Sequence, residues 1–282
     1  MKPKQKFIPA LIIAAVCLLP AAIYFGKQEK TYLYGLEQLS SGENMEAYRT
    51  FLSIEKYKDA GSYLQQMRTE DPLLPFRIAE KGSLVDFGHY EQDNDLSNGM
   101  ESIQWLILDR IGEQILLLSS AALEAKPYHT ESFDAVTWEE STLREWMNGY
   151  FYHTAFDQTE QKIISSVRNR NPDQSAVGTK GGADTLDRVF LLSESEAKIY
   201  FGNEIDQDMI GTARATEYVS HQDIETDEQG HVCWWLRSPG VYPYSAQFVD
   251  QEGKIYISGA YTDIDYQFAV RPAIWLDLKD QL

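Results

Sequence analysis

The strongest constraint on the fold of this chain is an apolar run of 20 residues, Phe7–Gly26, which contains no charged side chain. An α-helix of about 20 apolar residues is long enough to cross the hydrocarbon core of a bilayer. Lys2, Lys4 and Lys6 precede the run, and basic residues before a span favour a cytoplasmic N-terminus. The sequence therefore predicts a cytoplasmic stub at residues 1–6 and a transmembrane signal anchor at residues 7–26. The C-terminal domain is then expected to be extracellular, in a single-pass protein of the cell membrane.

Two other interpretations of this segment stay open. A cleaved signal peptide needs a small-x-small cleavage site, and Pro20-Ala21-Ala22 at the end of the run matches that pattern poorly. A lipoprotein modification at Cys17 is less favoured, because Val16 precedes the cysteine and apolar residues continue after it. An uncleaved anchor is therefore the leading interpretation.

The charge balance limits the classes of partner. Aspartate and glutamate number 43 against 25 lysines and arginines, which gives a formal net charge of −18. Nucleic acid is bound by clustered basic side chains, so it is not an expected partner. The two cysteines, Cys17 and Cys233, are divided between the predicted span and the distant C-terminal part. No disulfide within the chain is therefore expected.

Residues 31–69 have the pattern of amphipathic helices, with apolar residues at steps of three and four. The polar segment 40–44 contains a glycine and is expected to separate the first helix from the second. The spacing of Gly35, Ala47 and Phe51 resembles one tetratricopeptide unit, in which small residues let two antiparallel helices pack closely. We expect a helical, tetratricopeptide-like stalk at residues 28–70 that acts as a spacer.

From about residue 79 the pattern changes to short strands and turns. Alternation and β-branched content predict antiparallel strands at residues 103–109 and 114–119. Helices are predicted at 137–149, 154–167 and 193–201, and further strands at 189–192, 233–236, 246–249, 254–258 and 268–276. This order of strands, then helices, then strands predicts an α+β domain at residues 79–282.

Residues 91–99, EQDNDLSNG, have the oxygen density of a calcium-binding loop. Gly99 lies one position too late for an EF-hand, however, and the glutamate at the twelfth loop position is absent. A polar connection between two strands explains the run equally well. The five histidines lack the spacings typical of zinc ligands. The prediction is therefore no cofactor and no metal site, with calcium possible but not supported.

No catalytic motif is evident, and no catalytic residue is predicted. The lysine in Gly178-Thr-Lys-Gly does not stand in the order that binds phosphates, and there is no G-x-S-x-G elbow. Cys233 is flanked by Val232 and Trp234, which indicates a buried thiol rather than a nucleophile. Whether the protein is an enzyme stays uncertain, and a non-catalytic role is favoured.

The stretch HVCWWLRSPGVYPYSAQFVD, residues 231–250, contains two adjacent tryptophans followed by Arg237. In a strand, Arg237 lies on the same face as Trp235, where a guanidinium stacked on an indole is favourable. A second arginine, Arg271, occurs in FAVRPAIWL. Because carboxylates are abundant, both can be held in bidentate ion pairs. The prediction is that Arg237 and Arg271 are structural arginines.

Six motifs occur in order: F-G-x-Y-x-Q at 87–92, I-x-W-x-I-L-D at 103–109, T-W-x-x-S-x-L-R-x-W-x-N at 137–148, D-x-V-F-L-L-S at 187–193, W-W-L-R-S-P-G at 234–240 and V-R-P-A-I-W at 270–275. This combination resembles an uncharacterised domain family that is common in surface and multi-domain proteins of Gram-positive bacteria. That family is similar, more distantly, to C-type-lectin-like domains of the formylglycine-generating-enzyme kind. The resemblance implies a C-type-lectin-like domain of antiparallel strands with two or three helices and a long-loop binding face. It does not imply the enzymes' activity, because Cys233 is the only cysteine in the domain and their active site needs two.

The leading functional hypothesis is a membrane-anchored, extracytoplasmic and non-catalytic binding module for a protein or glycan ligand at the bacterial cell surface. Tyrosine provides a large amphipathic contact area at low entropic cost, although tyrosines can equally fill strand faces. The predicted ligand-binding residues are Tyr242, Tyr244, Tyr261, Asp263, Asp265 and Tyr266. The alternatives are an envelope enzyme acting on a cell-wall or protein substrate, and a scaffold that joins a membrane complex through the helical stalk.

Overall fold

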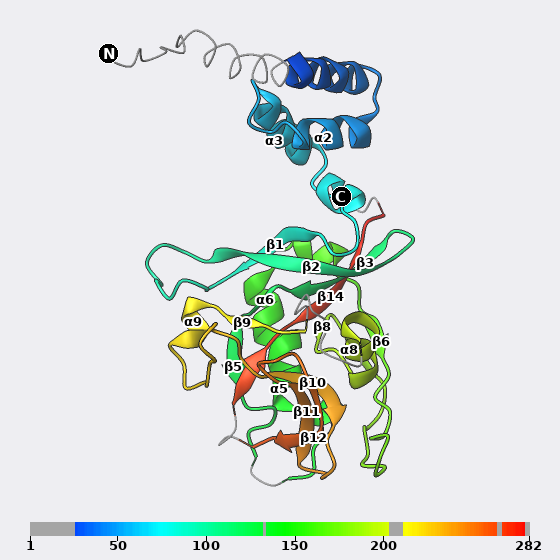
Figure 1. Cartoon of the computed structure of the whole chain (residues 1–282). Coiled ribbons are helices and arrows are strands. Elements are labelled where there is room, and N and C mark those ends of the chain that lie inside the picture. The colour runs from blue at the N-terminus through cyan, green and yellow to red at the C-terminus, as the bar shows by residue number, and fades with distance from the viewer. Residues whose placement is uncertain (1–25, 132–133, 203–210, 264–266, 280–282) are drawn as a thin grey trace, which may run out of the picture. The chain divides into compact units, whose positions relative to one another are not determined.

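The computed structural model describes residues 26–131, 134–202, 211–263 and 267–279. The chain divides into two compact units, Met1–Ile78 and Ala79–Leu282 (Figure 1). Each unit has its own elements and its own apolar core, and each is described here by itself.

The fold class expected from the sequence needs a correction at the membrane helix. Within the described ranges, no helix is both long and apolar enough to cross a bilayer. The first described helix, residues 26–40, carries Lys27, Glu29 and Lys30 in its first turns, and charged side chains at that spacing are costly in hydrocarbon. The predicted stub and residues 7–25 of the predicted anchor lie outside the described residues. The architecture that the structure shows is mixed α+β with mainly antiparallel sheets.

The first unit is helical, as the amphipathic pattern predicts. After the helix at residues 26–40 it contains α2 (Asn44–Leu52), α3 (Ala60–Glu70) and α4 (Leu74–Ile78). Phe51 is fully buried and stacks on Tyr63, with ring centroids 5.1 Å apart and an interplanar angle of 10°. A Cβ atom on Gly35 would lie only 2.8 Å from Cε1 of Phe51, so the first helix approaches α2 at the distance that only glycine allows.

The second unit contains two five-stranded sheets (Figure 1). The first has the order β1 (Leu84–Tyr90), β2 (Glu101–Ile111), β3 (Gln114–Ser119), β14 (Ala273–Asp277) and β8 (Val189–Phe190). The second has the order β12 (Ile255–Tyr261), β11 (Ser245–Val249), β10 (Trp234–Pro239), β13 (Phe268–Val270) and β5 (Glu124–Lys126). Neighbours within these two sheets are antiparallel, except for the parallel pair β10–β13.

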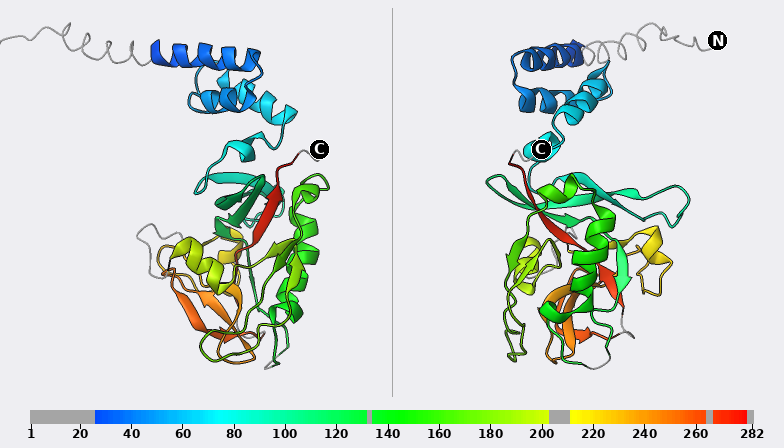
Figure 2. Two further views of the ribbon diagram at one scale, coloured as in Figure 1. Left: turned by 90° about the vertical axis from the view of Figure 1, so that its right-hand side faces the viewer. Right: turned by 180° about the vertical axis from the view of Figure 1, so that it is seen from behind.

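Two short ladders and several helices complete the second unit. The ladders are β4 (Ala121–Ala122) with β9 (Arg214–Ala215), and β6 (Val167–Asn169) with β7 (Thr185–Asp187). A helical stretch formed by α5 (Thr142–Trp146), the π-helix η2 (Met147–Phe151) and α6 (Tyr152–Ala155) runs along one side of this unit (Figure 2). The remaining helices are η1 (Trp138–Glu140), α7 (Glu160–Ile163), α8 (Glu194–Phe201) and α9 (Glu217–Ser220).

Four fully buried tryptophans join distant parts of this unit. Each indole is large and apolar but carries one N–H donor, which needs a partner when it is buried. Their Nε1 atoms donate to Phe87 O (Trp105, 2.7 Å), Asp187 Oδ2 (Trp138, 3.0 Å), Gly211 O (Trp234, 3.0 Å) and Lys126 O (Trp235, 2.9 Å). The core therefore fixes segments far apart in the chain, with these polar atoms satisfied.

Candidate functional site

Three of the six predicted ligand-binding residues lie together beyond the end of β10. The rings of Tyr242 and Tyr244 are stacked, with centroids 5.6 Å apart and planes 7° apart. The ring of Tyr261, the last residue of β12, lies 5.7 Å from Tyr244 at 49°. Tyr242 is 52% exposed and Tyr261 is 38% exposed. These three residues, here called the tyrosine cluster, form a contiguous aromatic surface that water reaches.

Local hydrogen bonds fix the backbone under the tyrosine cluster. Ser245 Oγ accepts from the amide of Tyr242 at 3.0 Å and donates to the carbonyl of Tyr242 at 2.9 Å, which closes the turn between β10 and β11. Ser245 is also the register partner of Tyr261, and the amide of Thr262 donates to Tyr244 O at 3.2 Å. Gly259 has φ +76°, and a Cβ atom there would lie 2.6 Å from Ala246 O. The tyrosines therefore project from a turn and a strand end with little freedom to rearrange.

The acidic members of the predicted site are placed differently. Asp263 is 2% exposed, and its Oδ1 atom is buried without a hydrogen-bond partner. Burying such an oxygen without a hydrogen bond costs free energy. Asp263 is close in sequence to Tyr261 of the tyrosine cluster. Asp265 and Tyr266 lie outside the described residues.

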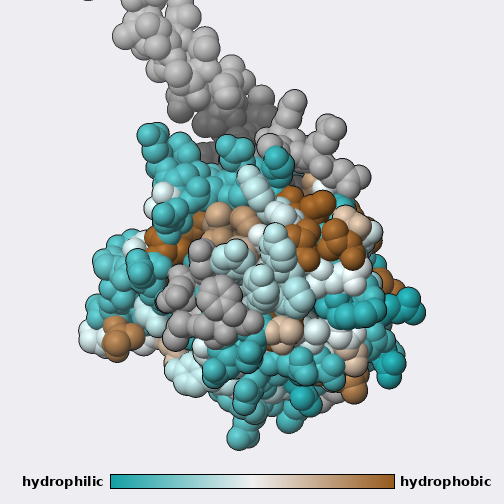
Figure 3. Space-filling model, turned by 90° about the horizontal axis from the view of Figure 1, so that it is seen from below, coloured by the Kyte–Doolittle hydropathy of each residue, from teal (hydrophilic) through white to brown (hydrophobic). Residues whose placement is uncertain are grey.

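The surface is mainly hydrophilic on the face shown in Figure 3, where apolar side chains form separate patches rather than one continuous area.

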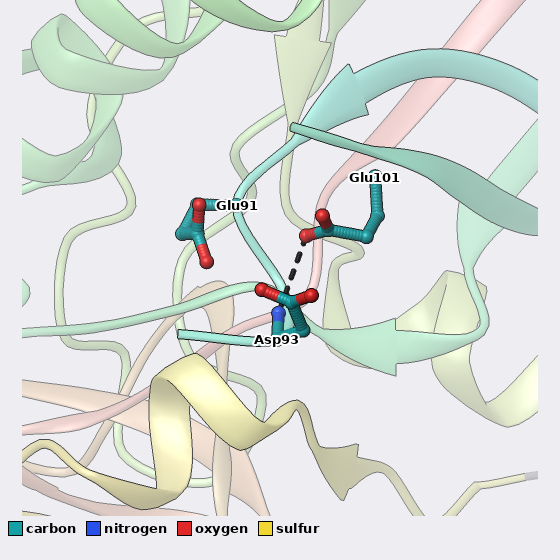
Figure 4. Close-up of side chains that lie close together, drawn as sticks. All are labelled: Glu91, Asp93 and Glu101. Atoms are coloured by element: carbon teal, nitrogen blue, oxygen red, sulfur yellow. Dashed lines mark hydrogen bonds between the residues drawn. The ribbon is translucent and has the colours of Figure 1, made fainter. Parts of the chain in front are cut away.

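A second group of candidate residues lies at the connection between β1 and β2. Glu91 directly follows β1, Glu101 begins β2, and Asp93 lies in the connection between them. One carboxylate oxygen from each can be chosen so that all three lie within 4.8 Å of one another. In Figure 4 the three carboxylates turn toward a common space, and the amide of Asp93 donates to Glu101 Oε2 at 3.2 Å. These three residues are here called the acidic cluster.

The surroundings of Glu91 in the acidic cluster disfavour the ionised form of its carboxyl group. Burial raises the pKa of Glu91, and the charges of Glu101 and Asp93 raise it further. Backbone N–H groups of Asn94 and Asp95 act in the opposite direction without cancelling the shift. Sequence reasoning singled out residues 91–99 but not Glu101, because only the pairing of Tyr90 with Glu101 across the two strands brings that carboxylate to the loop.

Arg237 is 4% exposed and makes a bidentate ion pair with Glu196 of α8. Its Nη1 atom also donates to Leu191 O at 2.7 Å, and the aromatic ring beneath the guanidinium is Phe190 at 5.7 Å. Burial acts to raise the pKa of Glu196, but the hydrogen bonds and the charge of Arg237 outweigh it and hold that pKa below its ordinary value. Glu196 therefore stays charged near neutral pH as the partner of Arg237.

Arg271 is 2% exposed and lies between two aromatic rings. Its guanidinium carbon is 5.2 Å from the Trp234 ring centroid and 5.9 Å from that of Phe201, and its Nε atom donates to Ser119 O at 2.8 Å. Burial lowers the pKa of Arg271 to about 9, which still leaves it cationic at neutral pH. Burial also raises the pKa of the Cys233 thiol to about 11, so this thiol is protonated at neutral pH and is a poor nucleophile.

No curated protein and no solved structure gives a significant match to this chain. The C-type-lectin-like similarity is therefore not confirmed. The model of a family described as a domain of unknown function, DUF6273, matches residues 105–278, which is more than half of the chain. The expectation of an uncharacterised domain family is confirmed to that extent. The chain belongs to the DUF6273 family, a family of domains of unknown function.

Proposed function

We propose that residues 79–282 form a non-catalytic binding module that takes a protein or glycan ligand at the bacterial cell surface through the tyrosine cluster. The observation that carries this proposal is that the Tyr244 ring contacts the rings of both Tyr242 and Tyr261, which are each at least 38% exposed, beside a hydrogen-bonded turn.

The tyrosine cluster has the properties of a binding surface of low entropic cost. A tyrosine side chain has two rotatable bonds, and the stacked pair Tyr242–Tyr244 is already ordered before a ligand arrives. Exposed aromatic faces take up the apolar faces of sugar rings or apolar side chains, and the phenolic hydroxyls can hydrogen-bond at the rim.

The observations near Arg237 do not favour the enzymatic alternative. A catalytic acid or base usually has a pKa shifted toward neutrality, whereas the pKa of Glu196 is lowered by its pairing with Arg237. The Cys233 thiol is protonated at neutral pH. No observation on the helical unit favours the scaffold alternative either.

The test is a binding screen with the full-length chain against glycans, cell-wall fragments and surface proteins. For any ligand found, Tyr242→Ala and Tyr261→Ala are expected to weaken binding about tenfold or more, because a central tyrosine anchor contributes on the order of 1.4 kcal/mol or more. Tyr150→Ala is the matched control, since Tyr150 is 62% exposed and stacks on Trp146 at 6.4 Å, away from the tyrosine cluster in sequence. If the three variants bind equally well, the tyrosine cluster is not the binding surface.

A further inference from the structure

The acidic cluster has the geometry of an oxygen-ligand site. Ca²⁺ accepts carboxylate oxygens in a flexible coordination geometry, whereas Mg²⁺ requires near-ideal octahedral geometry and is usually held by only one or two carboxylates. One carboxylate oxygen from each of the three residues can be chosen so that all three lie within 4.8 Å of one another, which lets them share one cation. Three carboxylates on an irregular connection therefore suit Ca²⁺ better than Mg²⁺.

Glu91 supplies a second and independent indication of a ligand. Glu91 is only 8% exposed, and its Oε1 atom is buried without a hydrogen-bond partner. The hydroxyl of the preceding residue, Tyr90, donates to Glu124 Oε2 at 2.9 Å instead. Figure 4 shows the Glu91 carboxylate directed toward the space it shares with Asp93 and Glu101. A buried carboxylate oxygen without a donor is costly, and a cation removes that cost.

The rest of the acidic cluster is held in place by the protein itself. Glu101 Oε2 accepts from the amide of Gln92 at 2.7 Å as well as from that of Asp93. The Asp93 carboxylate accepts from Asn98 Nδ2 at 2.7 Å and from the amide of Asp95 at 2.9 Å. The ligands are therefore ordered by hydrogen bonds, and the exposed position of Asp93 leaves room for water to complete the coordination shell.

No cationic side chain neutralises the acidic cluster within the described part of the chain: no ion pair joins any of its three carboxylates to a lysine, arginine or histidine. Three carboxylates in contact without a counter-charge repel one another. This repulsion is the physical reason to expect a cation from solution.

The arrangement differs from an EF-hand. Asp95, which an EF-hand pattern would use, turns back on its own loop: Asp95 Oδ1 accepts from the amide of Ser97 at 3.0 Å and from its hydroxyl at 2.6 Å. The candidate ligands are instead the first and third residues of the connection, Glu91 and Asp93, and the first residue of β2, Glu101.

We infer that Glu91, Asp93 and Glu101 form a divalent-cation site at the β1–β2 connection, with Ca²⁺ as the preferred ion. This cation site shares no residue with the tyrosine cluster, and the inference does not depend on the function proposed for the tyrosine cluster. Three carboxylates in a partly exposed loop correspond to the weaker class of calcium sites, with a dissociation constant on the order of 10⁻⁴ to 10⁻³ M.

The test is calcium titration of the chelator-treated full-length chain by calorimetry, at an ionic strength that suppresses non-specific attraction to an acidic protein. Terbium luminescence excited through tyrosine gives a second readout, since Tyr90 precedes Glu91 and its ring lies 6.4 Å from that of Tyr218. One saturable site is expected. Glu91→Gln and Glu101→Gln are each expected to weaken binding at least tenfold.

Asp95→Asn is the matched control, because it removes one charge from the same loop, outside the acidic cluster, and asparagine can keep the local turn. It is expected to change the affinity less than twofold. The inference is overturned by an absence of saturable binding at millimolar calcium, or by an equal loss of affinity in Asp95→Asn and Glu91→Gln. If Glu91→Gln does not fold, Glu101→Gln and the luminescence titration decide by the same criteria.

Discussion

At the scale of single residues, the W-W-L-R-S-P-G segment shows how buried polar atoms specify a core. The two tryptophans direct their N–H groups at the backbone carbonyls of Gly211 and Lys126. Arg237 directs its guanidinium at Glu196, whose carboxylate also accepts from the backbone amide of Ser193 in a capping box at the start of α8. The Glu196 carboxylate therefore caps the N-terminus of α8 and also neutralises the buried guanidinium of Arg237 in β10. Replacing Glu196 leaves the buried guanidinium of Arg237 without its counter-charge.

Glu196→Gln is therefore expected to destabilise the protein by about 3 kcal/mol at neutral pH, measured by urea unfolding. Because the folded-state pKa of Glu196 is lowered, its contribution is present above the ordinary glutamate pKa and is lost as the pH falls through the lowered value. The difference between the wild type and the variant should shrink over that acidic range. Asp173→Asn, which removes a carboxylate from the exposed pair with Lys180, should have little effect at any pH. Equal losses from both variants would contradict this account.

The sequence could place Arg237 in a tryptophan-rich strand, but it could not identify the contacts. Strict alternation puts Arg237 on the face of Trp235, whereas the ring beneath it is Phe190. The register of β10 against β11 shifts between Trp235 and Pro239, and such an irregularity breaks the alternation on which the prediction depended. The partner Glu196 lies 41 residues away, a separation that no local pattern reports.

At the scale of elements, periodic patterns predicted the strands and helices well where the local conformational preference of a segment agrees with its packing in the fold. The strand predicted at residues 114–119 is β3 as observed, and the one at 103–109 lies within β2. The helix predicted to stop at Gly149 instead continues through η2 into α6, because Met147 and Phe151 are fully buried on that stretch. The helix predicted at 154–167 was wrong for the most part. Within that range only residues 154–155, which end α6, and Glu160–Ile163 are helical, and Phe156 has an extended backbone.

The close approach of two helices at Gly35 gives a prediction for the helical unit. Gly35→Ala should gain about 1 kcal/mol of helix propensity but place a methyl group 2.8 Å from Cε1 of Phe51. Phe51 cannot move away easily, since it is fully buried and stacked on Tyr63. The net result is expected to be a loss of about 1 to 3 kcal/mol, measured by chemical unfolding of the full-length chain.

Gly26→Ala is the control for this change, because nothing lies within 4 Å of a Cβ atom at that position of the same helix. It should be neutral or slightly stabilising. A stabilising Gly35→Ala would show that the two helices can separate at little cost, and the close packing would then not hold this unit together.

At the scale of the whole molecule, each unit has its own core, and their predictability differs. The helical unit is built from neighbours in sequence, so its periodicity was enough to predict that it is helical. The break between α2 and α3 at residues 53–59 and the short helix α4 were not predicted. In the second unit β14 pairs with β3, and β13 pairs with β5, across more than a hundred residues. Such pairings depend on packing that has no local signature. The tyrosines of the tyrosine cluster could be proposed as a group because they occur in two short stretches of the sequence. Glu101 could not be assigned to the acidic cluster, because only the pairing of β1 with β2 brings it there.

The separate cores predict that core damage is confined to one unit. Leu64 is 1% exposed in the helical unit and Leu117 is fully buried in β3, and truncating either to alanine should cost about 2 to 5 kcal/mol in its own unit. Hydrogen exchange of the full-length chain, followed by mass spectrometry, can locate that cost. Leu64→Ala should speed exchange mainly in peptides from residues 44–70, and Leu117→Ala mainly in peptides from residues 101–119. If either substitution speeds exchange equally in both sets of peptides, the two cores unfold as one cooperative structure, and their division into two units has no energetic meaning.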